Sequence, residues 1–242
     1  MRGIILAGGS GTRLSPLTRI TSKQLLPVYD KPMVFYPLET LLKAGIEEIL
    51  FIIAPDHAGD FLKLLGSGKK FGAKFTYEIQ DKPEGLAQAF IIGQDFIGKD
   101  NVAMILGDNI FEDDFSKAIK KFRKGGYIFA KKVPDPERFG VVKFDSKGKA
   151  VMIEEKPKKL LSPYAITGLY IYDYRVIQAA KSLKPSARGE LEITDLHNWY
   201  LKKGELSVDI VRGEWMDAGT FDSLLSASNW AKNKVEKSLK TR

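Results

Sequence analysis

Short apolar segments alternate with segments of helical periodicity through the first half of the chain. Four short segments have the length and composition expected of strands in a parallel sheet: 3–7, 49–53, 75–79 and 102–106. Three segments place their apolar residues at helical spacing: 33–44, 61–65 and 86–96. This alternation predicts an α/β fold with a Rossmann-like, open and mostly parallel sheet that carries helices on both faces.

The spacing changes after residue 126, where shorter and strand-rich segments follow one another. Four strands are expected there, at 127–132, 140–144, 151–155 and 165–172. Two helices, a strand and a last helix are expected at 175–181, 191–203, 206–211 and from 221 onward. This pattern predicts that the second half of the chain forms a smaller lobe with a mixed sheet. No linker rich in Pro, Gly or Ser interrupts the chain, so we expect one domain over residues 1–242.

A glycine-rich loop follows the first expected strand. Gly8, Gly9 and Gly11 allow the backbone to adopt positive φ angles, and they lack the Cβ atoms that would keep a ligand away from the backbone N–H groups. Arg13 adds a planar guanidinium group, which is suited to binding phosphate. The dinucleotide fingerprint fails because Leu14 replaces its third glycine, and the Gly-Lys-Ser/Thr of a P-loop is absent. The glycines alone fit an ordinary strand-to-helix turn as well as a phosphate cradle.

The composition narrows the classes of function. The chain has 242 residues, 44% of them hydrophobic, a net charge of +8 and no cysteine, as in a globular protein of a reducing compartment. Basic residues gather at 117–124 and 232–242 without an aromatic-rich stripe, which favours solvated surfaces over nucleic-acid binding. No run of about 20 apolar residues is present to span a membrane. We expect a cytoplasmic protein whose partners are small anionic substrates, not nucleic acid or membrane.

Eight sequence blocks, in order along nearly the whole chain, resemble the sugar-1-phosphate nucleotidyltransferases. Within that family they are most similar to the branch that joins dTTP to glucose 1-phosphate. The blocks lie at 8–14, 22–33, 80–89, 106–111, 154–157, 167–170, 185–195 and 215–220.

The resemblance implies a reaction and a cofactor. A thymidylyl group would pass from dTTP to glucose 1-phosphate by direct, Mg²⁺-assisted displacement at the α-phosphorus, which gives dTDP-glucose and pyrophosphate. Residues 1–125 would mainly bind the nucleotide and residues 126–242 the sugar phosphate, in a homo-oligomer. Two alternatives stay open, namely a UTP-dependent or other sugar-1-phosphate nucleotidyltransferase, and a non-catalytic regulatory homologue that binds nucleotide sugars.

The resemblance also implies a role for individual residues. Arg13, Lys23 and Lys156 would be catalytic, and Asp108 and Asp217 would hold the metal ion, for which carboxylate oxygens are suited. The nucleotide would contact Leu6, Gly8, Gly9, Gly11, Thr12, Gln24, Gln80, Pro83, Gly85, Leu86 and Asp108. The sugar phosphate would contact Gly140, Glu155, Lys156, Thr167, Tyr170 and Arg188.

Residue chemistry by itself supports only some of these roles. Gln80 suits a thymine or uracil reader, because one amide offers a donor and an acceptor to the imide edge of the base. Asp108 and Asp217, considered without the motifs, also fit a turn residue and a helix cap. Phe139 stands where related proteins commonly carry tyrosine, which removes a hydroxyl near the expected sugar and weakens any prediction of sugar selectivity.

Overall fold

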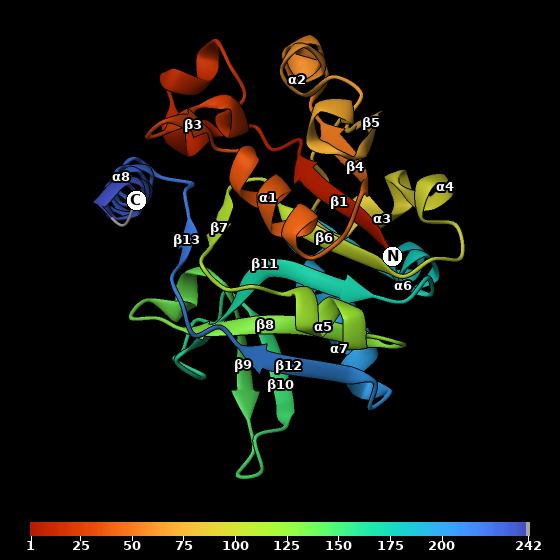
Figure 1. Cartoon of the computed structure of the whole chain (residues 1–242). Coiled ribbons are helices and arrows are strands. Elements are labelled where there is room, and N and C mark those ends of the chain that lie inside the picture. Colours follow the sequence, from red (N-terminus) through yellow and green to blue (C-terminus); the bar gives the residue numbers. More distant parts are fainter. Residues whose placement is uncertain (241–242) are drawn as a thin grey trace.

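A computed structural model describes residues 1–240, and within them nine strands form one twisted sheet (Figure 1). The strand order is β10-β9-β11-β6-β1-β4-β5, with β8 paired to β11 and β12 paired to β8. The strands are β1 (Arg2–Ala7), β4 (Glu48–Ile53), β5 (Lys74–Ile79), β6 (Val102–Leu106), β8 (Gly126–Lys132), β9 (Gly140–Phe144), β10 (Ala150–Glu155), β11 (Tyr164–Tyr172) and β12 (Leu206–Ile210). The predicted α/β class with a mostly parallel first half is confirmed.

Alternate residues of each central strand enter two separate cores. Ile4 and Leu6 face one core and Ile5 and Ala7 face the other, as the two-residue period of a strand requires. The first core is covered by α3 (Gln88–Ile92), α4 (Gln94–Ile97), α6 (Val176–Ser182) and α7 (Ile193–Lys202). The second core is covered by α1 (Phe35–Lys43), α2 (Ala58–Leu65) and α5 (Ser116–Lys121). Both faces of the sheet therefore carry helices.

The expected mixed lobe continues the parallel sheet without a break. β11 pairs antiparallel with β6, so that Leu169 lies opposite Ile105 and Tyr172 opposite Val102. β8 and β9 both pair antiparallel with β11, and β12 lies parallel to β8. Both halves of the chain therefore contribute to one sheet, and the division of binding roles at residue 125 stays a prediction.

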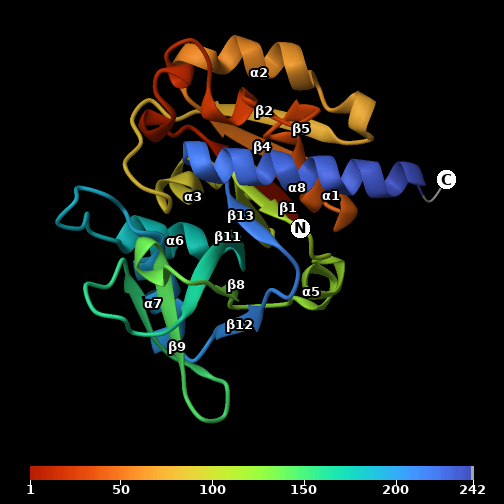
Figure 2. The same cartoon turned by 90° about the vertical axis from the view of Figure 1, so that its left-hand side faces the viewer.

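Two short sheets and a long helix lie beside the main sheet. β2 (Pro27–Val28) pairs with β3 (Lys31–Pro32), and β7 (Asn109–Phe111) pairs antiparallel with β13 (Trp215–Asp217). Figure 2 shows α8 (Phe221–Lys240) lying across the molecule, where it packs on β2 and β13. No helix in the described part of the chain combines the length and apolar character of a membrane span. The basic group at 232–242 ends at Arg242, which lies outside the described residues.

The helix expected over 86–96 is wrong as one continuous element. α3 ends at Ile92 and α4 begins at Gln94, with Gly93 between them. A Cβ on Gly93 would stand 3.0 Å from a Leu50 methyl group, so a glycine fits the close packing of this segment against β4. The other expected helices and strands occur with shifts of a few residues at their ends.

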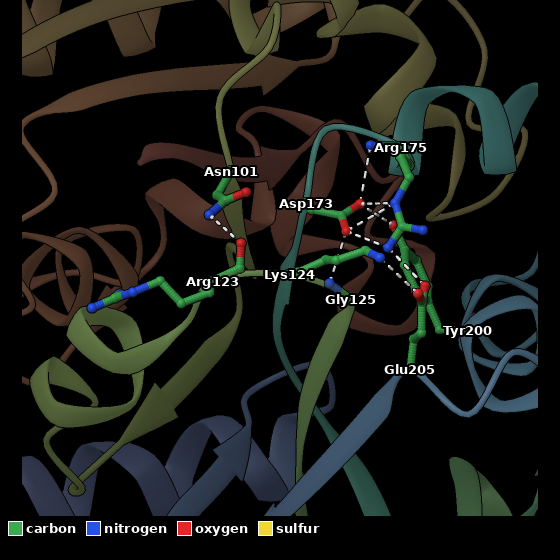
Figure 3. A network of polar contacts seen from close by, with 8 residues as sticks. All are labelled: Asn101, Arg123, Lys124, Gly125, Asp173, Arg175, Tyr200 and Glu205. Carbon is green, nitrogen blue, oxygen red and sulfur yellow. Dashed lines mark hydrogen bonds and ion pairs between the residues drawn. The ribbon is translucent and has the colours of Figure 1, made fainter.

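A polar network closes the edge of the sheet opposite the carboxyl ends of β1 and β6 (Figure 3). Asp173, which is 3% exposed, accepts hydrogen bonds from the Gly125 N–H at 2.7 Å and the Tyr200 hydroxyl at 3.1 Å. The Arg175 guanidinium pairs with Asp173 at 2.5 Å and with Glu205 at 2.7 Å. The network joins β8, β11, α7 and the start of β12, so we expect it to stabilise the second half of the fold.

Candidate active site

A pocket of about 480 Å³ opens at the carboxyl ends of β1 and β6, where ligands bind in open α/β sheets. Sixteen residues predicted from the sequence line it: Leu6, Gly9, Arg13, Lys23, Gln24, Gln80, Pro83, Gly85, Leu86, Asp108, Gly140, Glu155, Lys156, Tyr170, Arg188 and Asp217. They come from both halves of the chain. The fold therefore brings the expected nucleotide and sugar-phosphate residues into one cavity.

Four predicted residues lie outside this lining. Gly8 packs against Gln80, because a Cβ there would stand 2.2 Å from the Gln80 Oε1. Gly11 has a φ of 63° and precedes the short 3-10 helix Thr12–Leu14. The Thr167 side chain is fully buried and donates to the Phe129 carbonyl at 3.0 Å. Thr167 is buried behind the lining, and its contact with the sugar phosphate stays a prediction.

The glycine loop brings the Arg13 guanidinium to the end of β13. A Cβ on Gly219 would stand 2.8 Å from the Arg13 Nη2, so Gly219 leaves room for the guanidinium beside Asp217. Neither Arg13 nor Lys156 forms an ion pair within residues 1–240, although both line the pocket. Two unpaired cations in a partly enclosed cavity favour an anionic ligand.

Two carboxylates, Asp108 and Asp217, come together where β7 pairs with β13. Asp217 lies opposite Asn109 in the register, and the Ala218 N–H donates to the Asp108 carbonyl at 2.9 Å. Lys23 forms an ion pair with the Asp108 Oδ2, and the Asn109 Nδ2 donates to the Asp108 Oδ1 at 2.9 Å. Both oxygens of Asp108 are thus held in place.

The two acids differ in their affinity for a proton. Burial acts to raise the pKa of Asp108, but the Lys23 ammonium and the hydrogen bonds from Lys23 and Asn109 outweigh it and hold that pKa below its usual value. Burial, and then the negative charge of Asp108, raise the pKa of Asp217 to about 7. The Asp217 Oδ1 is buried and has no hydrogen-bond partner among residues 1–240. A cation between the two acids would relieve both the repulsion and the missing contact.

A second group of acidic and basic side chains lines the pocket around Arg188. Arg188 forms a two-point contact with the buried Glu192, with Nη2 at 2.7 Å and Nε at 3.1 Å from the carboxylate oxygens. The same guanidinium lies 3.4 Å from Glu155. Burial and the Glu192 charge raise the pKa of Glu155 above its usual value, against Lys156 and Arg188. The Glu155 carboxylate can accept hydrogen bonds from ligand hydroxyls.

Lys156 directly follows β10 in a left-handed backbone conformation, with a φ of 43°. A non-glycine residue rarely adopts this conformation, and it persists where the surrounding contacts enforce it. Here the Lys156 N–H donates to the Phe139 carbonyl at 3.0 Å. The Phe139 ring in turn packs against Trp215, with 5.2 Å between the ring centroids. The turn therefore fixes where the lysine leaves the sheet.

A family model for nucleotidyl transferases matches residues 2–234. The chain belongs to the nucleotidyl transferase family. It is 56% identical to the glucose-1-phosphate thymidylyltransferase of Neisseria meningitidis over 236 residues, and 57% identical to that of Mycolicibacterium smegmatis over 237 residues. These alignments cover 95% and 96% of this chain and 82% of each relative. They confirm the resemblance that the motifs carry.

Solved structures agree with this assignment. A candidate glucose-1-phosphate thymidylyltransferase from Bacillus anthracis, crystallised with sucrose, matches with a TM-score of 0.91 and 49% identity over 96% of this chain and 95% of the other. A UDP-glucose pyrophosphorylase with bound UDP-glucose matches with a TM-score of 0.85 over 96% and 98% of the two chains. At 23% identity this second match shows the shared fold alone.

Two residues that line the pocket of this nucleotidyl transferase, Asn109 and Glu192, have structural roles that the sequence motifs did not assign. The Asn109 Oδ1 accepts hydrogen bonds from the Trp215 Nε1 at 2.6 Å and the Gly168 N–H at 2.9 Å. Both partners only donate, so the amide must turn its Nδ2 toward Asp108. Asn109 and Glu192 lie inside the sequence blocks 106–111 and 185–195. Their roles depend on hydrogen bonds to residues such as Trp215 and Arg188, which no local sequence pattern predicts.

Proposed function

We propose that this chain transfers a thymidylyl group from dTTP to glucose 1-phosphate and releases pyrophosphate. The observation that carries the proposal is the identity of 56% and 57% to two glucose-1-phosphate thymidylyltransferases over almost the whole chain. The pocket supports it, because residues from the glycine loop and from the Glu155 strand line one continuous cavity. A nucleoside triphosphate and a sugar phosphate can thus meet in a single site.

The two carboxylates support a divalent cation, and we propose Mg²⁺. Mg²⁺ is usually bound by one or two carboxylates together with phosphate oxygens of the substrate. Asp108 and Asp217 fit this pattern through their pairing across β7 and β13 and through the partnerless Oδ1 of Asp217. Within residues 1–240 no cluster of three or more metal-ligating side chains occurs, which suits a site that substrate oxygens complete. When bound, Mg²⁺ would supply positive charge to the phosphate oxygens.

The reaction needs no general base from the protein. A phosphate monoester has a second pKa of about 6, so the attacking oxygen of glucose 1-phosphate is already mostly ionised at neutral pH. The task left to the protein is to hold two anions together and to stabilise the departing charge. We propose that Arg13 binds the pyrophosphate that leaves, that Lys23 binds the triphosphate, and that Lys156 holds the sugar phosphate.

We assign the remaining predicted residues to the base and the sugar. Gln80 is buried and lines the pocket, which supports a role in reading thymine or uracil. Glu155 and Arg188 line the same pocket and lie 3.4 Å apart, which supports contacts with sugar hydroxyls and phosphate. UTP in place of dTTP is the second candidate, because the imide edge is the same in both bases. A cytoplasmic location and a homo-oligomer stay predictions.

Pyrophosphate release tests the proposal directly. The purified chain is supplied with Mg²⁺ and glucose 1-phosphate, and with dTTP, UTP, CTP, ATP or GTP in separate reactions. We expect release with dTTP that disappears when the metal or the sugar phosphate is omitted. Binding of nucleotide without release from any pair would instead support the non-catalytic regulatory homologue.

A further inference from the structure

The Gln80 amide is connected to a second glutamine behind the pocket. Its side chain is 3% exposed, and its Nε2 donates to the Gln88 Oε1 at 2.7 Å. Gln88 begins α3 and does not line the pocket. It can therefore act on the pocket only through its partners, which are Gln80 and Glu84.

Glu84 fixes both ends of the Gln88 amide. The Glu84 backbone N–H donates to the Gln88 Oε1 at 3.1 Å, and the Glu84 carboxylate accepts from the Gln88 Nε2 at 2.8 Å. A backbone N–H only donates and an ionised carboxylate only accepts, so the reversed Gln88 amide would lose both contacts. The Gln88 oxygen therefore faces Gln80, and the Gln80 amide must present its nitrogen there.

This arrangement determines which way the base-reading amide faces. With its Nε2 held by Gln88, the Gln80 Oε1 lies on the other side, beside the glycine loop. Gly8 leaves the space for that oxygen, since a Cβ at residue 8 would stand 2.2 Å from it. Because Gln80 lines the pocket, a ligand there would meet the acceptor oxygen and the second N–H of the amide.

We propose that Gln88 is a positioning residue that makes the pocket select thymine or uracil over cytosine. The imide of thymine and uracil offers an N3–H donor beside a carbonyl acceptor, which matches the fixed Gln80 amide. Cytosine offers an N3 acceptor beside an amino donor, so it would place acceptor against acceptor and donor against donor. A reversed Gln80 amide would match cytosine, and Gln88 blocks that reversal. The inference rests on the proposed function, because it assigns the base to Gln80.

The test compares dTTP with CTP in Gln88→Met, which keeps the length of the side chain and its helical preference but removes the hydrogen bonds. The ratio of kcat/KM for dTTP to that for CTP should fall about 10-fold, as expected when one neutral hydrogen bond no longer orients the amide. The value for CTP itself should not fall. Gln94→Met is the matched control, because the Gln94 side chain accepts its hydrogen bond from Lys181 and lies outside the pocket lining.

Either of two results would overturn the inference. The ratio in Gln88→Met could equal that of the wild type, or kcat/KM for dTTP and CTP could fall by the same factor, as a merely structural role predicts. Calorimetric dissociation constants for dTTP and CTP give the same ratio without turnover. If the wild type turned over no nucleotide, the proposed thymidylyl transfer would fail, and the binding ratio would still decide the role of Gln88.

Discussion

The buried His197 predicts a measurable loss of stability in acid. Its side chain is fully buried, and its Nδ1 lies 2.6 Å from the Tyr172 hydroxyl. Burial lowers the pKa of His197 from its ordinary 6.5 to about 3. Between these values the unfolded chain binds a proton that the folded chain does not, so this contribution is complete above pH 6.5 and is lost as the pH falls toward 3. At pH 5 the loss is about 2 kcal/mol, at about 1.4 kcal/mol per pH unit.

The measurement compares the wild type with His197→Gln, whose amide can still partner Tyr172. Urea unfolding of both proteins at pH 8 and pH 5 should show the wild type losing about 2 kcal/mol more than the variant. In melting temperature the difference is about 4–8 °C for a chain of this size. The raised pKa of Asp217 acts in the opposite direction between pH 7 and 3.8, but it is common to both proteins and cancels. Equal losses in the two proteins would refute the reasoning.

Three further changes test the site and the fold. Asp108→Asn should lower pyrophosphate release at least about 100-fold, because a metal ligand contributes several kcal/mol; near-normal turnover would remove Asp108 from the metal site. Asn109→Ala should raise the Mg²⁺ concentration for half-maximal activity roughly 10-fold, and an unchanged metal titration would show that Asp108 needs no such support. Arg175→Ala should cost about 3 kcal/mol in urea unfolding, since it leaves the buried Asp173 carboxylate without its positively charged partner, while nucleotide binding stays unchanged; a loss below about 1 kcal/mol would contradict a stabilising network.

Local patterns were sufficient for most of the secondary structure. β1, β4 and β6 were predictable because a strand buried on both faces needs a continuous apolar run, and that requirement is met by a few neighbouring residues. The position of the glycine loop and Asp108 at the same end of the sheet was also predictable. Strands that alternate with helices form a parallel sheet, in which the carboxyl ends of the strands lie together. The sequence by itself therefore determined the fold class and the edge of the sheet at which the pocket forms.

Contacts between distant segments were decided only by the tertiary structure. β7 and β13 are three residues each and lie about a hundred residues apart, so no periodicity predicts the pairing that sets Asp217 opposite Asn109. The close packing of Gly93 against Leu50 likewise joins segments that are distant in the sequence. The proton affinities of Asp108 and Asp217 arise from burial and from Lys23, which only the fold brings into place. Sequence patterns specify local backbone and burial preferences, whereas site chemistry depends on through-space distances that the packed sheet alone sets.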